Sequence, residues 1–108
     1  MIAEIRLLTN SIEISERFWR AIYPTADAER GADRWGRQSV RITPQTGPDL
    51  LIGEAAAWNL ITTVDMVVQT DAGAAQRLRD AGFEVAHDGT QAVDVNATDA
   101  TVFLVAQP

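Results

Sequence analysis

The sequence IAEIRLLTNSIEISERFW, residues 2–19, passes from an apolar strand pattern into an amphipathic helix pattern. The sequence LITTVDMVVQTD, residues 60–71, leads into a second helix pattern that ends at Gly82. Short strand patterns follow each helix, so each half predicts a strand, a helix and further strands. One unit of roughly fifty residues cannot bury its apolar face alone, so two such units should pack together. The order predicts an α+β fold of two βαβββ modules.

In the first half, Ser11 is a suitable N-cap for a helix that Pro24 ends. On that helix we expect Phe18 to point inward and Trp19 to be partly exposed or to lie at a contact between the modules. The polar residues 25–38 predict a loop with room for a short strand. Alternating apolar residues predict further strands over 39–43 and 49–55.

In the second half, residues 60–68 give the strongest strand pattern of the chain. Asp71 is expected to cap a helix that runs to about residue 81, and Gly82 suits the positive φ at its end. Asp88-Gly89 is a turn sequence. The remaining strands are expected over residues 83–87, 91–95 and 101–105. The modules then span 2–55 and 60–106, within one domain of residues 1–108.

Composition excludes several classes of protein. The chain has 108 residues, no cysteine and a net charge of −6. Disulfides and cysteine-based zinc sites are therefore excluded, and the acidic balance argues against nucleic acid as a partner. No run of about 18 apolar residues predicts a membrane span. The first residues carry no signal-peptide pattern, so we expect a cytoplasmic protein.

Two motifs resemble the vicinal oxygen chelate superfamily, which includes glyoxalases, extradiol dioxygenases and bleomycin resistance proteins. Residues 11–19, SIEISERFW, are similar to its turn and helix with a Phe-Tyr or Phe-Trp pair. Residues 63–82 are similar to its strand and helix ending in a Leu-x-x-x-Gly signature. The resemblance implies two βαβββ modules forming a cup of curled mixed β-sheet, with helices on the outer face. It also implies a homodimer with ligands bound in the cup.

Metal-binding members of the superfamily place His, Gln or Glu ligands on the first and last strands of each module. In this chain the matching positions of the second half carry Thr63 and Phe103, and only Glu4 in the first half lies near a ligand position. A catalytic divalent metal generally needs three protein ligands. We therefore expect no metal and no other cofactor. If a metal were present, Glu4 would be its ligand.

Trp35 and Trp58 lie outside the clearest strands and helices, where tryptophan either lines a ligand site or caps the core. Asp65 lies within a strand on the face shared by Thr63, and Arg41 is a candidate counter-ion in the cup or at its rim. His87, the one histidine, lies beside a turn, where we expect exposure rather than a general base. The predicted ligand-binding residues are Trp35, Arg41, Trp58, Thr63, Asp65 and Phe103.

Three functions follow from this reading. The first is a metal-free small-molecule-binding protein of the bleomycin resistance type, which sequesters an antibiotic or another planar or cationic compound. The second is a metal-dependent lyase or dioxygenase with unusual ligands, for example Glu4, Glu54, Asp65 and His87. The third is a structural or regulatory dimer whose cup is filled by its own side chains. An enzymatic role stays open, although the absence of the usual ligand residues argues against it.

Overall fold

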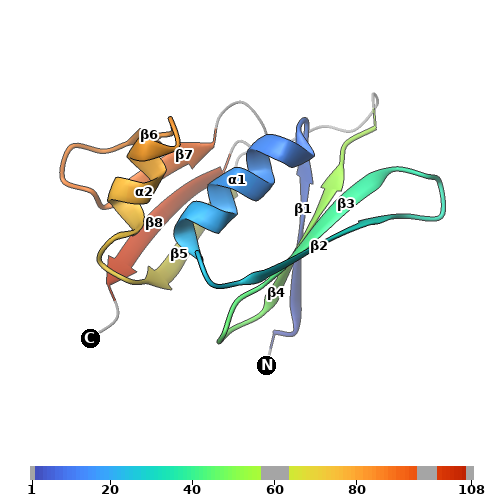
Figure 1. The fold of residues 1–108 in the computed structure, drawn as a ribbon, viewed down its shortest axis with the longest axis horizontal. Coiled ribbons are helices and arrows are strands. Elements are labelled where there is room, and N and C mark those ends of the chain that lie inside the picture. The colour runs from blue at the N-terminus through green and yellow to red at the C-terminus, as the bar shows by residue number, and fades with distance from the viewer. Residues whose placement is uncertain (1, 57–63, 95–99, 107–108) are drawn as a thin grey trace.

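Figure 1 shows the computed structural model, which describes residues 2–56, 64–94 and 100–106. Module one runs β1(Glu4–Thr9), α1(Ile12–Ile22), β2(Asp27–Ala32), β3(Gln38–Thr43) and β4(Asp49–Glu54). Module two runs β5(Val64–Thr70), α2(Ala74–Asp80), β6(Glu84–Val85), β7(Gln91–Asp94) and β8(Ala100–Ala106). The α+β fold of two βαβββ modules predicted from the sequence is confirmed.

Each module forms one four-stranded mixed sheet. The strand order is β1-β4-β3-β2 in sheet 1 and β5-β8-β7-β6 in sheet 2. The first and last strands of each module pair in parallel, and the other pairs are antiparallel. Each helix is the crossover element that follows the first strand of its module, so it lies over one face of its own sheet.

The helices cover one face of the sheets and leave the other open. α1 packs on β3 and β4, α2 packs on β6 and β7, and the two helices contact each other. Strand residues alternate accordingly: Leu7, Ile52 and Val102 are buried on the covered face, whereas their neighbours in sequence are more exposed. Each sheet therefore has a covered face and an open face. None of the described helices is long and apolar enough to cross a membrane.

The caps of α1 agree with the sequence. The Ser11 side chain accepts a hydrogen bond from the Ile14 amide at 3.3 Å, which confirms the predicted N-cap. Phe18 points inward as expected. Its ring packs edge to face on that of Trp19, with the ring centroids 5.5 Å apart. Trp19 is fully buried rather than partly exposed, and its core cluster contains residues of both modules, which fits the alternative expectation of a contact between the modules. A pattern within one helix does not reveal that cover.

Three segments differ from the sequence prediction. Residues 27–32 form a six-residue strand that pairs with β3 along its whole length, whereas the expectation was a loop with room for only a short strand. α2 begins at Ala74 with Gly73 as its N-cap, not with Asp71. β6 has only two residues, fewer than predicted. Residues 60–63 of the predicted strand lie outside the described residues. Gly82 and Gly89 both have positive φ, as their predicted turn positions require.

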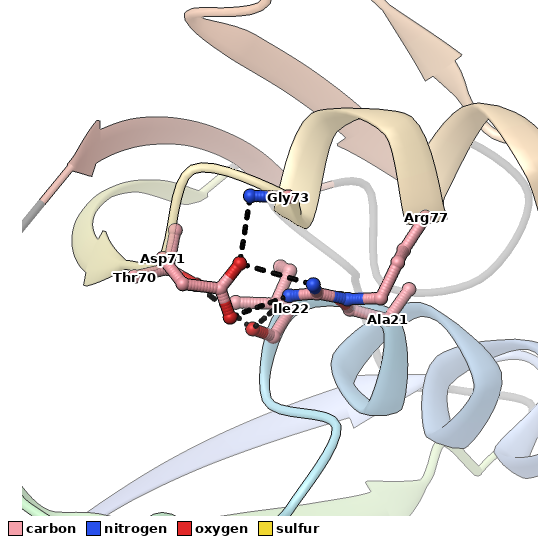
Figure 2. A network of polar contacts seen from close by, with 6 residues as sticks. All are labelled: Ala21, Ile22, Thr70, Asp71, Gly73 and Arg77. Atoms are coloured by element: carbon pink, nitrogen blue, oxygen red, sulfur yellow. Dashed lines mark hydrogen bonds and ion pairs between the residues drawn. The ribbon is translucent and has the colours of Figure 1, made fainter.

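Arg77 of α2 joins the two modules at the C-terminal end of α1 (Figure 2). Its Nε donates to the Ala21 carbonyl at 2.7 Å, and its Nη1 and Nη2 each lie 3.0 Å from one carboxylate oxygen of Asp71. The Thr70 hydroxyl donates to the Ile22 carbonyl at 2.9 Å. The last carbonyls of α1 have no partner within the helix, so the Arg77 and Thr70 donors satisfy them. The positive charge of Arg77 also interacts favourably with the negative end of the helix dipole. We call this the Arg77 clamp.

Candidate functional site

The open face of sheet 1 is hollowed across its middle. The register places Leu8, Gly53, Ser39 and Gly31 in one row across the four strands. Gly53 and Gly31 have no side chain, and Ser39 has a small one. The open face is therefore hollowed along this row from β4 across β3 to β2, beside the side chain of Leu8 on β1. Gly31, Ser39 and Gly53 form the floor of a cavity of about 470 Å³. We call this floor the glycine trough.

The next row of side chains forms one wall of this cavity. It carries Arg6, Leu51, Arg41 and Glu29 in register across the sheet. Four arginines and two acids line the cavity as a whole, but Arg30 pairs with Glu16 of α1 at 3.1 Å, and Arg6 and Arg41 also have acidic partners outside the lining. The arginines are Arg6, Arg30, Arg37 and Arg41, and the acids are Glu29 and Asp33.

Two of these arginines belong to a continuous chain of ion pairs. Glu4 Oε2 lies 2.7 Å from Arg6 Nε, and Glu4 Oε1 lies 2.7 Å from Arg41 Nη1. The same Arg41 nitrogen lies 3.0 Å from Asp49 Oδ2. We call Arg6, Glu4, Arg41 and Asp49 the ion chain. It fixes the position of the Arg41 guanidinium, which borders the trough.

The ion chain determines the charge states along this wall. Hydrogen bonds from Arg6 and then Arg41 lower the pKa of Glu4 below its ordinary value. The hydrogen bond with Glu4 and then that with Asp49 raise the pKa of Arg41. Glu4 and Arg41 are therefore both charged at neutral pH. Because these ion pairs are accessible to water, they contribute little to the free energy of unfolding, and their main effect is to hold the guanidinium groups in position.

A hydrogen-bonded turn lies beside the cavity. The Asp33 carboxylate accepts hydrogen bonds from the Trp35 amide at 2.8 Å and the Arg37 amide at 2.9 Å. Gly36 follows with a φ of 79°, which glycine adopts without strain. Asp33 and Arg37 line the cavity, whereas Trp35 stands 74% exposed between them in sequence. The turn is the tip of the long hairpin of β2 and β3 in Figure 1.

The residues predicted to bind a ligand lie in different places. Arg41 lines the cavity on sheet 1, and Trp35 lies at the hairpin tip beside it. Asp65 is exposed and Phe103 is half-buried, and both lie on the open face of sheet 2. Trp58 and Thr63 lie outside the described residues. The proposed pairing of Arg41 with Asp65 is wrong, because Arg41 pairs with Glu4 and Asp49.

The residues of the alternative metal site do not come together. Glu4 and Glu54 lie at opposite ends of the parallel pair of β1 and β4. Asp65 and His87 belong to module two, and both are exposed, His87 in a turn as expected. In the ranges that the structure describes, no three His, Asp or Glu side chains lie close enough to hold a metal ion. Both carboxylate oxygens of Glu4 already contact arginines.

Sequence reasoning missed the glycine trough. A signal was present, because a glycine inside a strand pattern often marks a place where another group approaches the backbone closely. Gly53 follows Leu51-Ile52 in such a strand. Its alignment with Ser39 and Gly31, however, depends on strand register, which the sequence pattern does not provide.

Solved structures share this fold. The fosfomycin resistance protein FosX of Listeria monocytogenes aligns with a TM-score of 0.72 at 15% identity, over 100% of this chain and 92% of that chain. A possible glyoxalase of Bacillus cereus aligns with a TM-score of 0.65 at 14% sequence identity, over 97% of each chain. A glyoxylase/bleomycin resistance protein/dioxygenase domain of Frankia sp. aligns with a TM-score of 0.67 at 14% sequence identity, over 96% of this chain and 90% of that chain.

No protein-family profile matches the sequence. No curated protein sequence matches it either. At identities of 14–15% the structural likeness establishes the fold and not the activity. The chain therefore has the fold of the vicinal oxygen chelate superfamily, as the two sequence motifs predicted.

Proposed function

We propose that this chain is a small-molecule-binding protein whose ligand lies in the glycine trough. The observation that carries the proposal is the row of Gly53, Ser39 and Gly31 on the open face of sheet 1. These residues leave a cavity of about 470 Å³, which is within the size range of ligand sites, roughly 300–1,000 Å³. A sheet face with no ligand to accommodate would gain more stability from larger side chains at such positions.

The shape and lining of the cavity favour a planar ligand with acceptor oxygens. Glycine in the floor allows a flat molecule to lie against the backbone. The Arg41 guanidinium is planar and offers several N–H donors in a fixed fork. The net charge of −6 led to the expectation of a cationic ligand, whereas the Arg37 and Arg41 side chains in the lining are N–H donors suited to acceptor oxygens. Net charge describes the whole surface, whereas the ligand meets the local set of charges.

We further propose that binding needs no metal. The only carboxylate near a ligand position of the superfamily, Glu4, is held by Arg6 and Arg41. The alternative is a metal-dependent lyase or dioxygenase. Elemental analysis after exposure to nickel, manganese and iron distinguishes them. Metal-free binding predicts less than about a tenth of an equivalent of bound metal per chain, whereas a metal enzyme should hold close to one equivalent of metal per chain.

A homodimer and a cytoplasmic location belong to the same proposal. The open face of sheet 2 exposes Val67 by 73% and Val105 by 43%, which suits contact with a second copy. In the third alternative, a structural dimer, the cup would be filled by its own side chains. Sedimentation analysis tests for the dimer. A ligand-competition measurement then tests whether the trough stays open within it.

The ligand proposal is tested with a panel of planar aromatic acids and their esters. Trp35 is exposed beside the cavity, so its fluorescence should change on binding. A Trp35→Phe variant separates its signal from that of the other tryptophans. Saturable binding by the acids, lost in a variant that fills the trough, would support the proposal. No saturable response across the panel, or binding unaffected by filling the trough, would refute it.

A further inference from the structure

We infer that the chain has a second ligand site, between the two modules at the C-terminal end of α1, for a neutral, mostly apolar molecule with an acceptor oxygen. The feature that points to it is the indole of Trp19. This side chain is fully buried, and its Nε1 has no hydrogen-bond partner among the residues that the structure describes. Buried polar groups are nearly always paired, because an unpaired one loses its bonds to water without replacement. The Trp19 N–H therefore needs an acceptor from elsewhere.

A cavity of about 720 Å³ lies beside this indole. Trp19 and Tyr23 line it from the C-terminal end of α1, and residues 66–70 of β5 line it from module two. Figure 1 shows this end of α1 beside β5. The β3–β4 turn at residues 44–48 also contributes to the lining. The volume is within the range of small-molecule sites, roughly 300–1,000 Å³.

This cavity is separate from the glycine trough. In the described parts of the chain, the two cavities have no lining residue in common. Leu50, which is buried on the covered face of sheet 1, lines the cavity beside Trp19. The trough lies on the open face of the same sheet. A ligand of one site therefore does not occupy the other.

The charges of the lining favour a neutral ligand. Of the described residues that line the cavity, Asp71 is the only charged one. Arg77 donates to both of its carboxylate oxygens at 3.0 Å, so this charge is already paired. Burial raises the pKa of Tyr23, so its phenol is neutral at physiological pH. An ion that entered this lining would lose its hydration and gain no free counter-charge.

The remaining surface suits an apolar molecular body. Leu50, Met66 and Val68 supply aliphatic surface. The Tyr23 ring stacks on that of Trp19, with the ring centroids 6.3 Å apart and the planes 15° from parallel. Met66 and Tyr23 are half-buried, and an unbranched methionine side chain repacks readily. The lining can therefore adjust to bring a ligand oxygen to the covered Nε1.

The first test uses camphor, a neutral and compact molecule with one carbonyl oxygen. The chain has three tryptophans, so a variant with Trp35→Phe and Trp58→Phe keeps only the indole N–H of Trp19. Bound camphor should move the proton NMR signal of this N–H downfield in a saturable way, because a hydrogen bond forms. Camphorsulfonate has the same skeleton and a negative charge. It should bind at least about tenfold more weakly.

A matched side chain separates the N–H from the shape of the indole. In the same double variant, Trp19 is replaced by benzothienylalanine, which has sulfur in place of the N–H. Camphor should bind about tenfold more weakly to this protein. The free energy of unfolding without ligand should not fall, because the N–H has no partner to lose. A fall would assign the N–H to a resident water molecule and reject its role in ligand binding.

Two phenylalanine variants test the cavity itself. Met66→Phe narrows it, whereas Val64→Phe enlarges a side chain on the same face of β5, outside the lining. Only the first should weaken camphor binding, by at least about tenfold. Equal effects of the two variants, or no saturable shift of the Trp19 signal, would overturn the inference. Binding of planar acids in the trough is measured with different probes, so the failure of one proposal leaves the other standing.

Discussion

The two modules have the same strand order, but their open faces have different chemistry. Each first strand ends in a threonine, Thr9 in β1 and Thr70 in β5, and each pairs in parallel with the last strand of its module. Counting back from these threonines matches Glu4 with Asp65. The covered faces remain alike, since both bury aliphatic side chains against a helix.

On the open faces the matched residues differ. Arg6 of module one corresponds to Val67 of module two, so Asp65 has no matching arginine. Gly53 corresponds to Val105, so the position that forms the trough in sheet 1 is filled in sheet 2. One scaffold thus carries a hollow, charged face in module one and a fuller, more apolar face in module two. The fold fixes the backbone of both, and a few open-face residues set their separate roles.

The largest expected effect comes from making module one resemble module two at the trough. A Cβ on Gly53 would meet no atom within 4 Å, so Gly53→Phe should be accommodated in the sheet. The ring would fill the cavity and weaken binding of planar acids at least about a hundredfold, or about 2.7 kcal/mol. Fluorescence titration measures this. Val105→Phe is the matched control, and an equal loss in that variant would contradict the comparison.

The second prediction concerns the Arg77 clamp that holds the two modules together. Arg77→Ala removes the charged partner of Asp71 and the donors to the Ala21 and Ile22 carbonyls. Loss of charged hydrogen bonds should lower the free energy of unfolding by about 1.5–3 kcal/mol. Chemical denaturation measures it. Arg77→Lys keeps the charge but not the fork, so it should recover only part of the loss. Full recovery would show that geometry is unimportant here.

The clamp also predicts a pH dependence. The hydrogen bond from Arg77 lowers the pKa of Asp71 below its ordinary value of 3.8. A carboxylate with a lowered folded-state pKa adds stability above its unfolded pKa, and that stability is lost as the pH falls through the folded value. The wild type should exceed Asp71→Asn in stability at pH 6. The two should converge as the pH falls below the folded-state pKa of Asp71. A constant difference across this range would exclude the ion pair as its cause.

The smallest effect comes from rebuilding the missing arginine in module two. Val67→Arg places a guanidinium two residues from Asp65, as Arg6 lies two residues from Glu4. An exposed pair of this kind contributes about 0.2–1 kcal/mol and is screened by salt. Thermal unfolding at low and high ionic strength measures it. A gain that persists in about 1 M salt would point to packing rather than charge.

Local features of the fold could be predicted from the sequence, whereas features set by pairing could not. The Ser11 cap and the Gly82 helix end depend on a few neighbouring residues, and both were predicted. For β2 only a short strand within a loop was expected, because its residues are mostly polar and exposed and only pairing with β3 makes them a full strand. Burial of Trp19 and alignment of Gly53 with Gly31 also depend on contacts distant in sequence. The floor of the candidate site is therefore the least predictable part.

The most direct test of the ligand site is to record amide NMR shifts of the labelled chain on titration with a planar aromatic acid. A ligand lying in the trough should shift the amides of Gly31, Ser39 and Gly53 first, with Arg41 beside them. The matched residues of β5 and β8 should be unaffected. Shifts centred on Val67 and Val105, or no saturable shift anywhere on sheet 1, would contradict the assignment of the ligand site to module one.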